Sequence, residues 1–220
     1  MSNRIKIWDL PTRLFHMALA LLVLGAFVTV NMGDEWMQLH GQLGLCTLSL
    51  IGFRLIWGIF GGHWSKFKHF PLGLAQIFAY LSKRSPQTSS YAGHNPLGSL
   101  STLLMLAVFL LQALTGLCSD DEVLLSGPLT KYLSSHQIEM ATFYHSEIGQ
   151  PLILLIVSLH VLAVLLYKFL FKQNLITPMI TGYKEDIDTA IESQDTKSSR
   201  LLGLFIFLLL LSILFYSLPI

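Results

Sequence analysis

Four histidines lie within or beside the long apolar runs of this 220-residue chain, namely His16, His40, His145 and His160. Ionisable side chains are costly inside a bilayer, where they face protein rather than lipid and mark functional sites. Imidazole is a frequent metal ligand, a proton carrier and a pH-sensitive group. The chemistry to consider is therefore metal or cofactor binding, proton transfer, or hydrogen bonding to the backbone.

Two of these histidines share one apolar stretch, which runs from Ser134 to Lys172. His145 and His160 are separated by ~22 Å along a helix, which is most of a hydrocarbon core that is ~30 Å thick. At ~100° per residue, His160 is turned by ~60° from His145, so the two side chains suit partners on two different neighbouring helices. The stretch therefore presents two imidazoles at two membrane depths.

The composition is that of an integral membrane protein, because 53% of the residues are hydrophobic and only 12% are charged. Apolar runs of about twenty residues indicate helices rather than barrel strands. Cys46 and Cys118 belong to no CxxC or CxxCH pattern. Covalently attached haem, iron–sulfur clusters and zinc ribbons are thus excluded, and no nucleic-acid partner is expected.

Five membrane spans are predicted, at about residues 14–30, 39–60, 96–118, 134–172 and 201–216. A secretory signal peptide is an alternative for the first run, but no small-x-small cleavage site follows it. The chain is expected to divide into a bundle at residues 1–183 and a polar linker with a C-terminal helix at 184–220.

Local signals define where several helices begin or bend. Asp9 and Pro11 are typical of a helix start, and Ser134 with Gln137 forms a capping-box pattern. Pro151 should loosen or kink the fourth span one turn after His145. Residues 71–83 have the apolar spacing of a short amphipathic helix at the membrane interface.

Glycines are frequent in the second span, at positions 41, 44, 52 and 58. Glycine allows a flat ligand or another helix to approach the backbone closely. For each of these four positions, either a ligand or simple helix packing is expected.

The distribution of basic residues predicts the orientation. With five spans, every Lys and Arg except Lys131 belongs to one side. The positive-inside rule assigns that side, with the N-terminus, to the cytoplasm. The opposite loops carry Asp and Glu, at positions 34, 35, 120, 121, 122, 139 and 147.

This topology groups the histidines into two levels, with His16 and His160 toward the cytoplasm and His40 and His145 toward the outside. Zinc or a di-iron centre would need further carboxylate or thiolate ligands, which the spans do not offer. A haem needs two axial ligands from the protein and is flat and apolar. Two b-type haems, one per level, are the economical interpretation.

Other interpretations remain open for the histidines. Each could be hydrogen-bonded to the backbone, or the set could form a proton or solute relay, although no intramembrane Asp or Glu accompanies it. His63, His69 and His136 are expected to be solvated in loops. His94, just before the third span, could touch a haem edge or a quinone.

Several segments in order resemble the bacterial cytochrome b561 family, which includes the b-type subunits of nickel–iron hydrogenases. They are IWDLPTRLFH at 7–16, LHGQLG at 39–44, FRLIWG at 53–58, GHNPLGSL at 93–100, and the two histidines of the fourth span followed by ITG at 180–182. The resemblance covers residues 5 to about 183. The fifth span, after Lys184, departs from the family pattern.

The resemblance implies a four-helix transmembrane bundle in the bacterial inner membrane, with two haems b held by His16, His40, His145 and His160. It also implies electron transfer between the membrane quinone pool and a periplasmic partner such as a c-type cytochrome. A superoxide:quinone oxidoreductase that uses the outer haem directly is an alternative. A haem-free membrane anchor or transporter is another, from a different class.

Two groups of charges could serve this function. Arg13 and Arg54 are expected to pair with the propionates of the cytoplasmic-side haem, or else to extend to lipid phosphates. The acidic outer loops could steer a basic electron carrier, or they could merely reflect the bias of basic residues to the other side.

Overall fold

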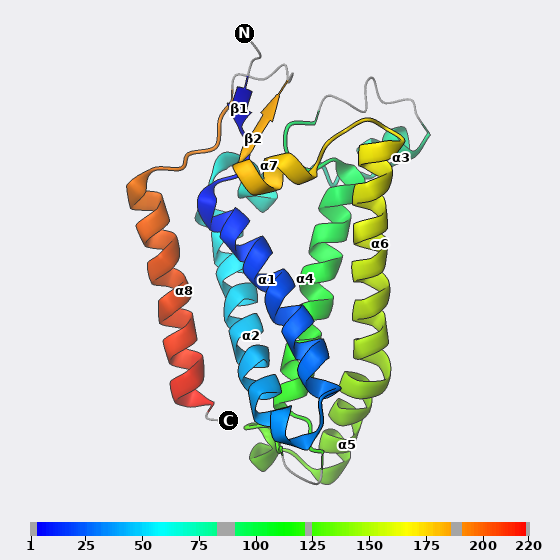
Figure 1. The fold of residues 1–220 in the computed structure, drawn as a ribbon, viewed down its shortest axis with the longest axis vertical. Coiled ribbons are helices and arrows are strands. Elements are labelled where there is room, and N and C mark those ends of the chain that lie inside the picture. Colours follow the sequence, from blue (N-terminus) through cyan, green and yellow to red (C-terminus); the bar gives the residue numbers. More distant parts are fainter. Residues whose placement is uncertain (1–3, 83–90, 122–124, 186–190, 219–220) are drawn as a thin grey trace. The chain divides into compact units, whose positions relative to one another are not determined.

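The computed structural model describes residues 4–82, 91–121, 125–185 and 191–218, and most of these residues are helical (Figure 1). Within these described ranges, five segments are long and apolar enough to cross a bilayer. They are α1 (Leu10–Val30), α2 (Met37–Phe60), α4 (Pro96–Leu117), the continuous run of α5 (Ser135–Phe143), η5 (Tyr144–Gly149) and α6 (Gln150–Phe169), and α8 (Lys197–Ser217). The prediction of an all-α membrane protein with five spans is confirmed.

Internal contacts divide the chain into two compact units, and the long helices contribute segments to both. The first unit contains Met1–Leu14, Arg54–Leu104 and Val157–Gly203. The second contains Phe15–Phe53, Met105–Ile156 and Leu204–Ile220. The boundary expected from the sequence, between residues 183 and 184, stays a prediction.

The spans differ in how much of their surface other residues cover. In the most apolar stretch of the span that contains α2, 56% of the residues are buried. In the corresponding stretch of α8, only 6% are buried. Large apolar side chains are exposed along the spans, as at Leu21 on α1 and Phe205 on α8. Such surfaces are stable in lipid, which solvates apolar groups without the cost that water imposes.

Asp9 organises the first unit. Its Oδ1 accepts the backbone N–H of Thr12 at 2.8 Å, which is the N-cap bond expected for the start of α1. The same carboxylate, with no exposed surface, also accepts the indole N–H of Trp57 at the end of α2. The Gly62 N–H and the Ser65 hydroxyl complete its shell. One buried charge is thus satisfied by groups from three segments.

A small antiparallel sheet joins a segment near the N-terminus to a segment between the fourth and fifth spans. Strand β1 (Arg4–Lys6) pairs with β2 (Tyr183–Glu185), and Ile5 lies opposite Lys184. The preceding helix α7 (Ile176–Thr181) ends at Gly182, whose φ of 90° suits glycine. The sequence did not predict this sheet, because three-residue strands carry no readable alternation.

Short helices follow α2 in the first unit. They are η2 (His63–Ser65), η3 (Phe67–His69) and α3 (Leu74–Leu81). The expected amphipathic helix at 71–83 is present as α3, and it exposes Leu74, Phe78 and Leu81. Lys83 lies outside the described residues.

The fourth span begins where the sequence predicted, and its helix is irregular just before Pro151. Ser134 and Gln137 form the capping box at the start of α5. The irregularity before Pro151 is a π-helical turn, η5, which contains His145. The link between α1 and α2 carries η1 (Asp34–Trp36), and η4 (Thr130–Tyr132) precedes α5.

Helix α8 packs through small residues in each unit. In the first unit a Cβ added at Gly203 would lie 3.1 Å from Pro11. In the second unit a Cβ at Gly52 would lie 3.4 Å from Leu210, an ordinary contact. Gly52 is therefore a packing position. Gly58, where a Cβ would collide with the Phe67 ring, is another.

Candidate functional site

Two of the four predicted histidines face each other in the second unit. His40, near the start of α2, and His145, in the π-turn η5, have ring centroids 6.1 Å apart and ring planes at 86°. Both side chains are half-buried. The sequence placed these residues at one level from helix direction alone.

Each ring is oriented by a backbone carbonyl. Nδ1 of His40 lies 2.9 Å from the carbonyl oxygen of Ala26 on α1, and Nδ1 of His145 lies 3.0 Å from that of Gln112 on α4. A carbonyl oxygen can only accept, so Nδ1 carries the proton in both rings. The Nε2 lone pairs are then free to bind a metal, which is the usual arrangement of ligating histidines.

The distance between the rings fits one metal ion held between them. A metal–imidazole bond is ~2.0–2.1 Å and a ring centroid lies ~1.1 Å from its nitrogen, so two axial imidazoles place their centroids ~6.2–6.4 Å apart. The observed 6.1 Å matches this spacing.

A cavity of about 260 Å³ includes both histidines among its lining residues. This volume is near the lower limit of small-molecule sites, which is ~300 Å³. Apolar side chains line most of the cavity, from α1, α2, α4 and α6, among them Val23, Phe27, Phe109 and Ile153. The lining suits a flat, apolar ligand.

Glycines of α2 and α4 line this cavity without projecting a side chain into it. Gly41 and Gly44 on α2 and Gly116 on α4 all line it. A Cβ at Gly44 would meet nothing within 4 Å, whereas one at Gly116 would come within 2.8 Å of Cε1 of His145. Of the four glycines considered from the sequence, Gly41 and Gly44 therefore line the cavity, whereas Gly52 and Gly58 contact other side chains of their units.

The donor set favours a haem over a simple metal ion. Within the described ranges, no group of three or more His, Cys, Asp or Glu side chains could hold a metal. Two imidazoles suffice for a haem, because the porphyrin supplies four nitrogens. The residues present thus fit a b-type haem with two axial histidines.

One rim of the cavity is polar. Ser119, Asp120, Asp121 and Ser126 lie on the loop after α4, and Thr142 and Ser146 lie on the facing helix. The backbone N–H of Asp120 donates to the Thr142 hydroxyl at 3.1 Å. Among the described residues, the lining includes no Lys or Arg. The described part of this rim is therefore acidic in composition.

The other two histidines lie in different units. His16 is two turns into α1 in the second unit, and His160 is on α6 in the first. Both are half-buried. Their pairing at one level stays a prediction from the sequence.

Both predicted arginines belong to the first unit, but their surroundings differ. Arg54 is only 2% exposed, its guanidinium lies 4.6 Å above the Phe67 ring, and its Nη1 has no hydrogen-bond partner among the described residues. Arg13 donates through Nη2 to the carbonyl of Ile180 on α7. The Nε of Arg13 also has no hydrogen-bond partner among the described residues. An unmet buried donor points to an anion as partner, and Arg54 is the stronger candidate because it is the more deeply buried of the two.

The loop histidines of the first unit are more enclosed than expected. His94 packs between Trp8 and Phe70, with ring centroids 4.8 Å from each. His63 and His69 stack with centroids 3.8 Å apart, and both are half-buried. Burial lowers the pKa of His63, and nearby His69 lowers it further. His136 is exposed as predicted, but it lies in the first turn of α5 and not in a loop.

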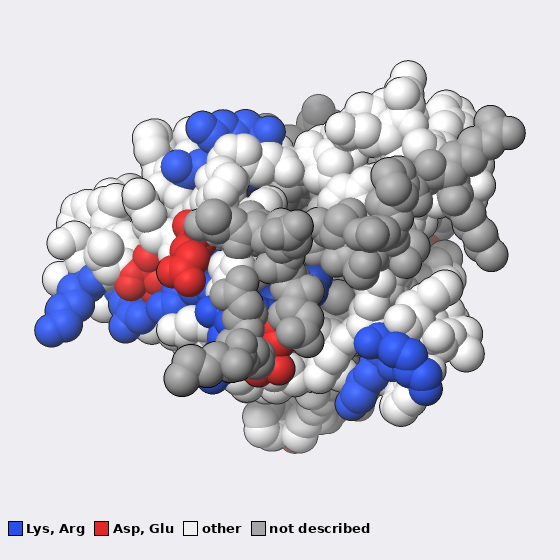
Figure 2. All heavy atoms as spheres, turned by 90° about the horizontal axis from the view of Figure 1, so that it is seen from above, with Lys and Arg blue, Asp and Glu red and all other residues white. Residues whose placement is uncertain are grey.

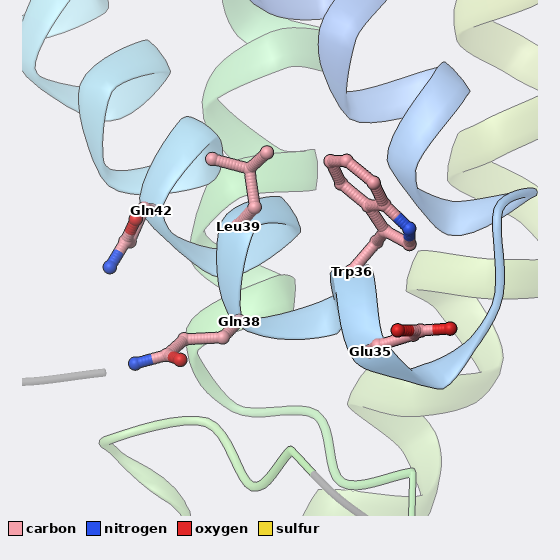
Figure 3. Close-up of a pocket in the computed structure, with 5 residues that line it drawn as sticks. All are labelled: Glu35, Trp36, Gln38, Leu39 and Gln42. Atoms are coloured by element: carbon pink, nitrogen blue, oxygen red, sulfur yellow. The ribbon is translucent and has the colours of Figure 1, made fainter.

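A second concavity, of about 310 Å³, lies at the start of α2 and was not foreseen (Figure 3). Glu35, Trp36, Gln38, Leu39 and Gln42 line it. In Figure 3 the amides of Gln38 and Gln42 point away from the indole of Trp36. No sequence signal marks the pocket, since these residue types are common at helix ends near a membrane surface.

Comparison with known proteins gives one result. A family model described as prokaryotic cytochrome b561 matches residues 7–182, which is most of the chain. The searches of curated proteins and of solved structures returned no match.

Proposed function

Because this chain belongs to the prokaryotic cytochrome b561 family of membrane-embedded b-type cytochromes, which carry electrons across the membrane, we propose that it does so through two haems b. His40 and His145 would hold one haem, and His16 and His160 the other. The haem-free anchor or transporter does not fit membership of this family.

The spacing of His40 and His145 carries the proposal. Their centroid distance of 6.1 Å, their Nδ1 protons held by carbonyls, and the cavity between them are what an axial pair requires. A bound haem supplies a one-electron carrier, and two histidine ligands leave its iron no open position for substrate. The expected chemistry is outer-sphere electron transfer.

A second haem at His16 and His160 would divide the membrane crossing. The hydrocarbon core is ~30 Å thick, and two carriers reduce it to hops that tunnelling can manage. This part of the proposal rests on the positions of the two histidines along α1 and α6.

Arg54 would pair with a propionate of this second haem. Its buried Nη1 lacks a partner among the described residues, and a carboxylate is the natural acceptor for a guanidinium donor. Arg13, which already donates to Ile180, would contribute as a nearby positive charge.

The bacterial inner membrane, with the N-terminus in the cytoplasm, is the proposed location. Figure 2 looks onto the end of the first unit that carries β1, where Lys and Arg side chains lie at several places. Lys83 and Arg84, which also count toward this side, lie outside the described residues. Basic residues near the ends of spans favour the cytoplasmic face and its anionic lipids.

The proposed route of electrons runs between membrane quinone and a periplasmic protein such as a c-type cytochrome. The acidic rim of the cavity, at Asp120 and Asp121, supports a basic partner through electrostatic attraction. Glu122 lies outside the described residues. The same rim disfavours superoxide as a substrate, since it would repel an anion.

The test is a visible spectrum of the purified protein, oxidised and reduced, with haem quantified against protein. Two haems b per chain, reducible by a quinol analogue, are the expected result. A protein that stays colourless after expression with ample haem would end the proposal. If the protein holds two haems that no quinol analogue reduces, the proposed role of quinone is wrong and the two-haem proposal stands.

A further inference from the structure

We propose that Gln112 is the positioning residue of His145: it holds the imidazole so that Nε2 is presented to the haem, and so sets the electronic properties of that haem. This inference rests on the proposed function. It concerns a residue that neither the histidine pattern nor the family match singles out.

Gln112 contacts His145 twice, in opposite directions. Its backbone carbonyl accepts the Nδ1 proton of His145 at 3.0 Å. Its side-chain Nε2 donates to the backbone carbonyl of His145 at 2.9 Å. One residue of α4 therefore fixes both the ring and the main chain of the ligand.

The π-turn makes the second bond useful. Residues Tyr144–Gly149 leave the regular i to i−4 hydrogen-bond ladder, and Pro151 has no N–H to offer. His145 therefore lies in an irregular turn of its own helix. An amide from α4 supplies a fixed point outside the helix.

Gly149 makes room for this amide. A Cβ at Gly149 would collide with Oε1 of Gln112 and would lie 2.9 Å from its Cδ. The Oε1 atom is buried without a hydrogen-bond partner among the described residues. An orphan acceptor costs free energy that an apolar side chain would avoid. The hydrogen bond that Nε2 of Gln112 donates to the carbonyl of His145 offsets this cost.

The consequence for a bound haem follows from ligand basicity. A hydrogen bond from Nδ1 to a carbonyl makes Nε2 a better donor to the metal, which favours ferric iron. If the amide is lost, the turn can shift and the Nδ1 bond to Gln112 lengthens. The reduction potential of this haem should then rise, and part of its low-spin signal should become high-spin.

The decisive variant is Gln112→Met, which keeps side-chain length but removes the amide. Three properties of the haem-loaded protein are measured: the haem content, the electron paramagnetic resonance spectrum and the midpoint potential of each haem. We expect one haem of two to shift to higher potential with a changed low-spin signal. Gln76→Met, on the exposed face of α3, is the matched control and should change neither haem.

A second variant, Gly149→Ala, keeps every side chain of α4 and pushes the amide aside. Gly149→Ala should also raise the midpoint potential of one haem. If Gln112→Met loses both haems, the potential of the haems in Gly149→Ala is the test of the inference. Two unshifted haems in both variants would overturn the inference. A His145→Leu variant that keeps the full haem content of the wild-type protein would instead overturn the proposed function.

Discussion

The imidazoles of His40 and His145 face each other across 6.1 Å, although 104 positions of the chain separate them. Each ring is held by a carbonyl from a third helix, Ala26 on α1 for one and Gln112 on α4 for the other. Four helical segments therefore meet at one site, and its rigidity comes from backbone acceptors. Backbone acceptors cannot be removed by substitution, so the variants that test the site change the ligands or the residues that pack against them.

Replacing either ligand should remove one haem and leave the other. His40→Leu and His145→Leu are each expected to halve the haem-to-protein ratio, because a single axial histidine binds haem weakly at this site. Haem extraction and the reduced-minus-oxidised spectrum give the ratio. His136→Leu, at an exposed position, should keep the wild-type ratio. A full haem complement in both ligand variants would contradict the assignment.

A methyl group at Gly116 should disturb His145 without touching its chemistry. In Gly116→Ala the new Cβ would lie 2.8 Å from Cε1 of His145, closer than side chains tolerate, so the ring must move. The low-spin signal of one haem should broaden or weaken. Gly52→Ala, whose Cβ would make only an ordinary contact with Leu210, should leave the spectrum as in the wild type. Equal spectra for the two alanine variants would show that Gly116 does not confine the ring.

Removing the buried cation at Arg54 should lower the potential of the second haem. A unit charge at ~15 Å and an effective dielectric constant of ~20 is worth about 1 kcal/mol, or about 40 mV for one electron. Arg54→Leu should therefore shift one haem downward by tens of millivolts, as measured by redox titration. Lys68→Leu removes an exposed charge of the same unit and should have a smaller effect. Unchanged potentials and haem content in Arg54→Leu would refute a propionate role.

Low pH should weaken the ion pairs through which Asp195 links Lys6 of β1 to Arg200 of α8. Asp195 accepts Nε of Arg200 at 2.8 Å and Nζ of Lys6 at 3.0 Å, and its side chain is 2% exposed. The bond from Arg200 is the main reason that the pKa of Asp195 lies below its usual range, with Lys6 adding to the shift against the effect of burial.

A depressed carboxyl pKa stabilises the fold above the ordinary pKa, near 3.8, and this contribution is lost as the pH falls through the folded-state value. Asp195→Asn should thus cost about 1 kcal/mol at neutral pH and progressively less below about pH 4. Thermal melting in detergent across this range measures the difference. Glu192→Gln, which removes an exposed carboxylate, should show no such trend. A constant deficit down to pH 2 would argue against the charge pairing.

Charge on the cavity rim should control the rate of reaction with a basic electron carrier. Asp120→Asn with Asp121→Asn should slow electron exchange with a positively charged c-type cytochrome at low salt, because attraction raises the encounter rate. Raising the ionic strength should remove the difference. An uncharged acceptor of similar potential provides the control, since its rate should not change. A cytochrome rate that ignores salt would rule out steering.

The amino-acid sequence by itself determined the class of the protein, its five spans, the caps at Asp9 and Ser134, and the common level of His40 and His145. These features follow from hydropathy, from residue types that act within one helical turn, and from helix rise and direction, all of which are local. Only the tertiary structure decided which glycines line a cavity, that Arg13 donates to Ile180 whereas Arg54 lies over the Phe67 ring, that β1 pairs with β2, and that Gln112 holds His145. Those relationships join residues far apart in the chain, and they depend on how the helices of each unit are rotated about their axes. Hydropathy constrains that rotation only weakly in a span whose outer face is solvated by lipid.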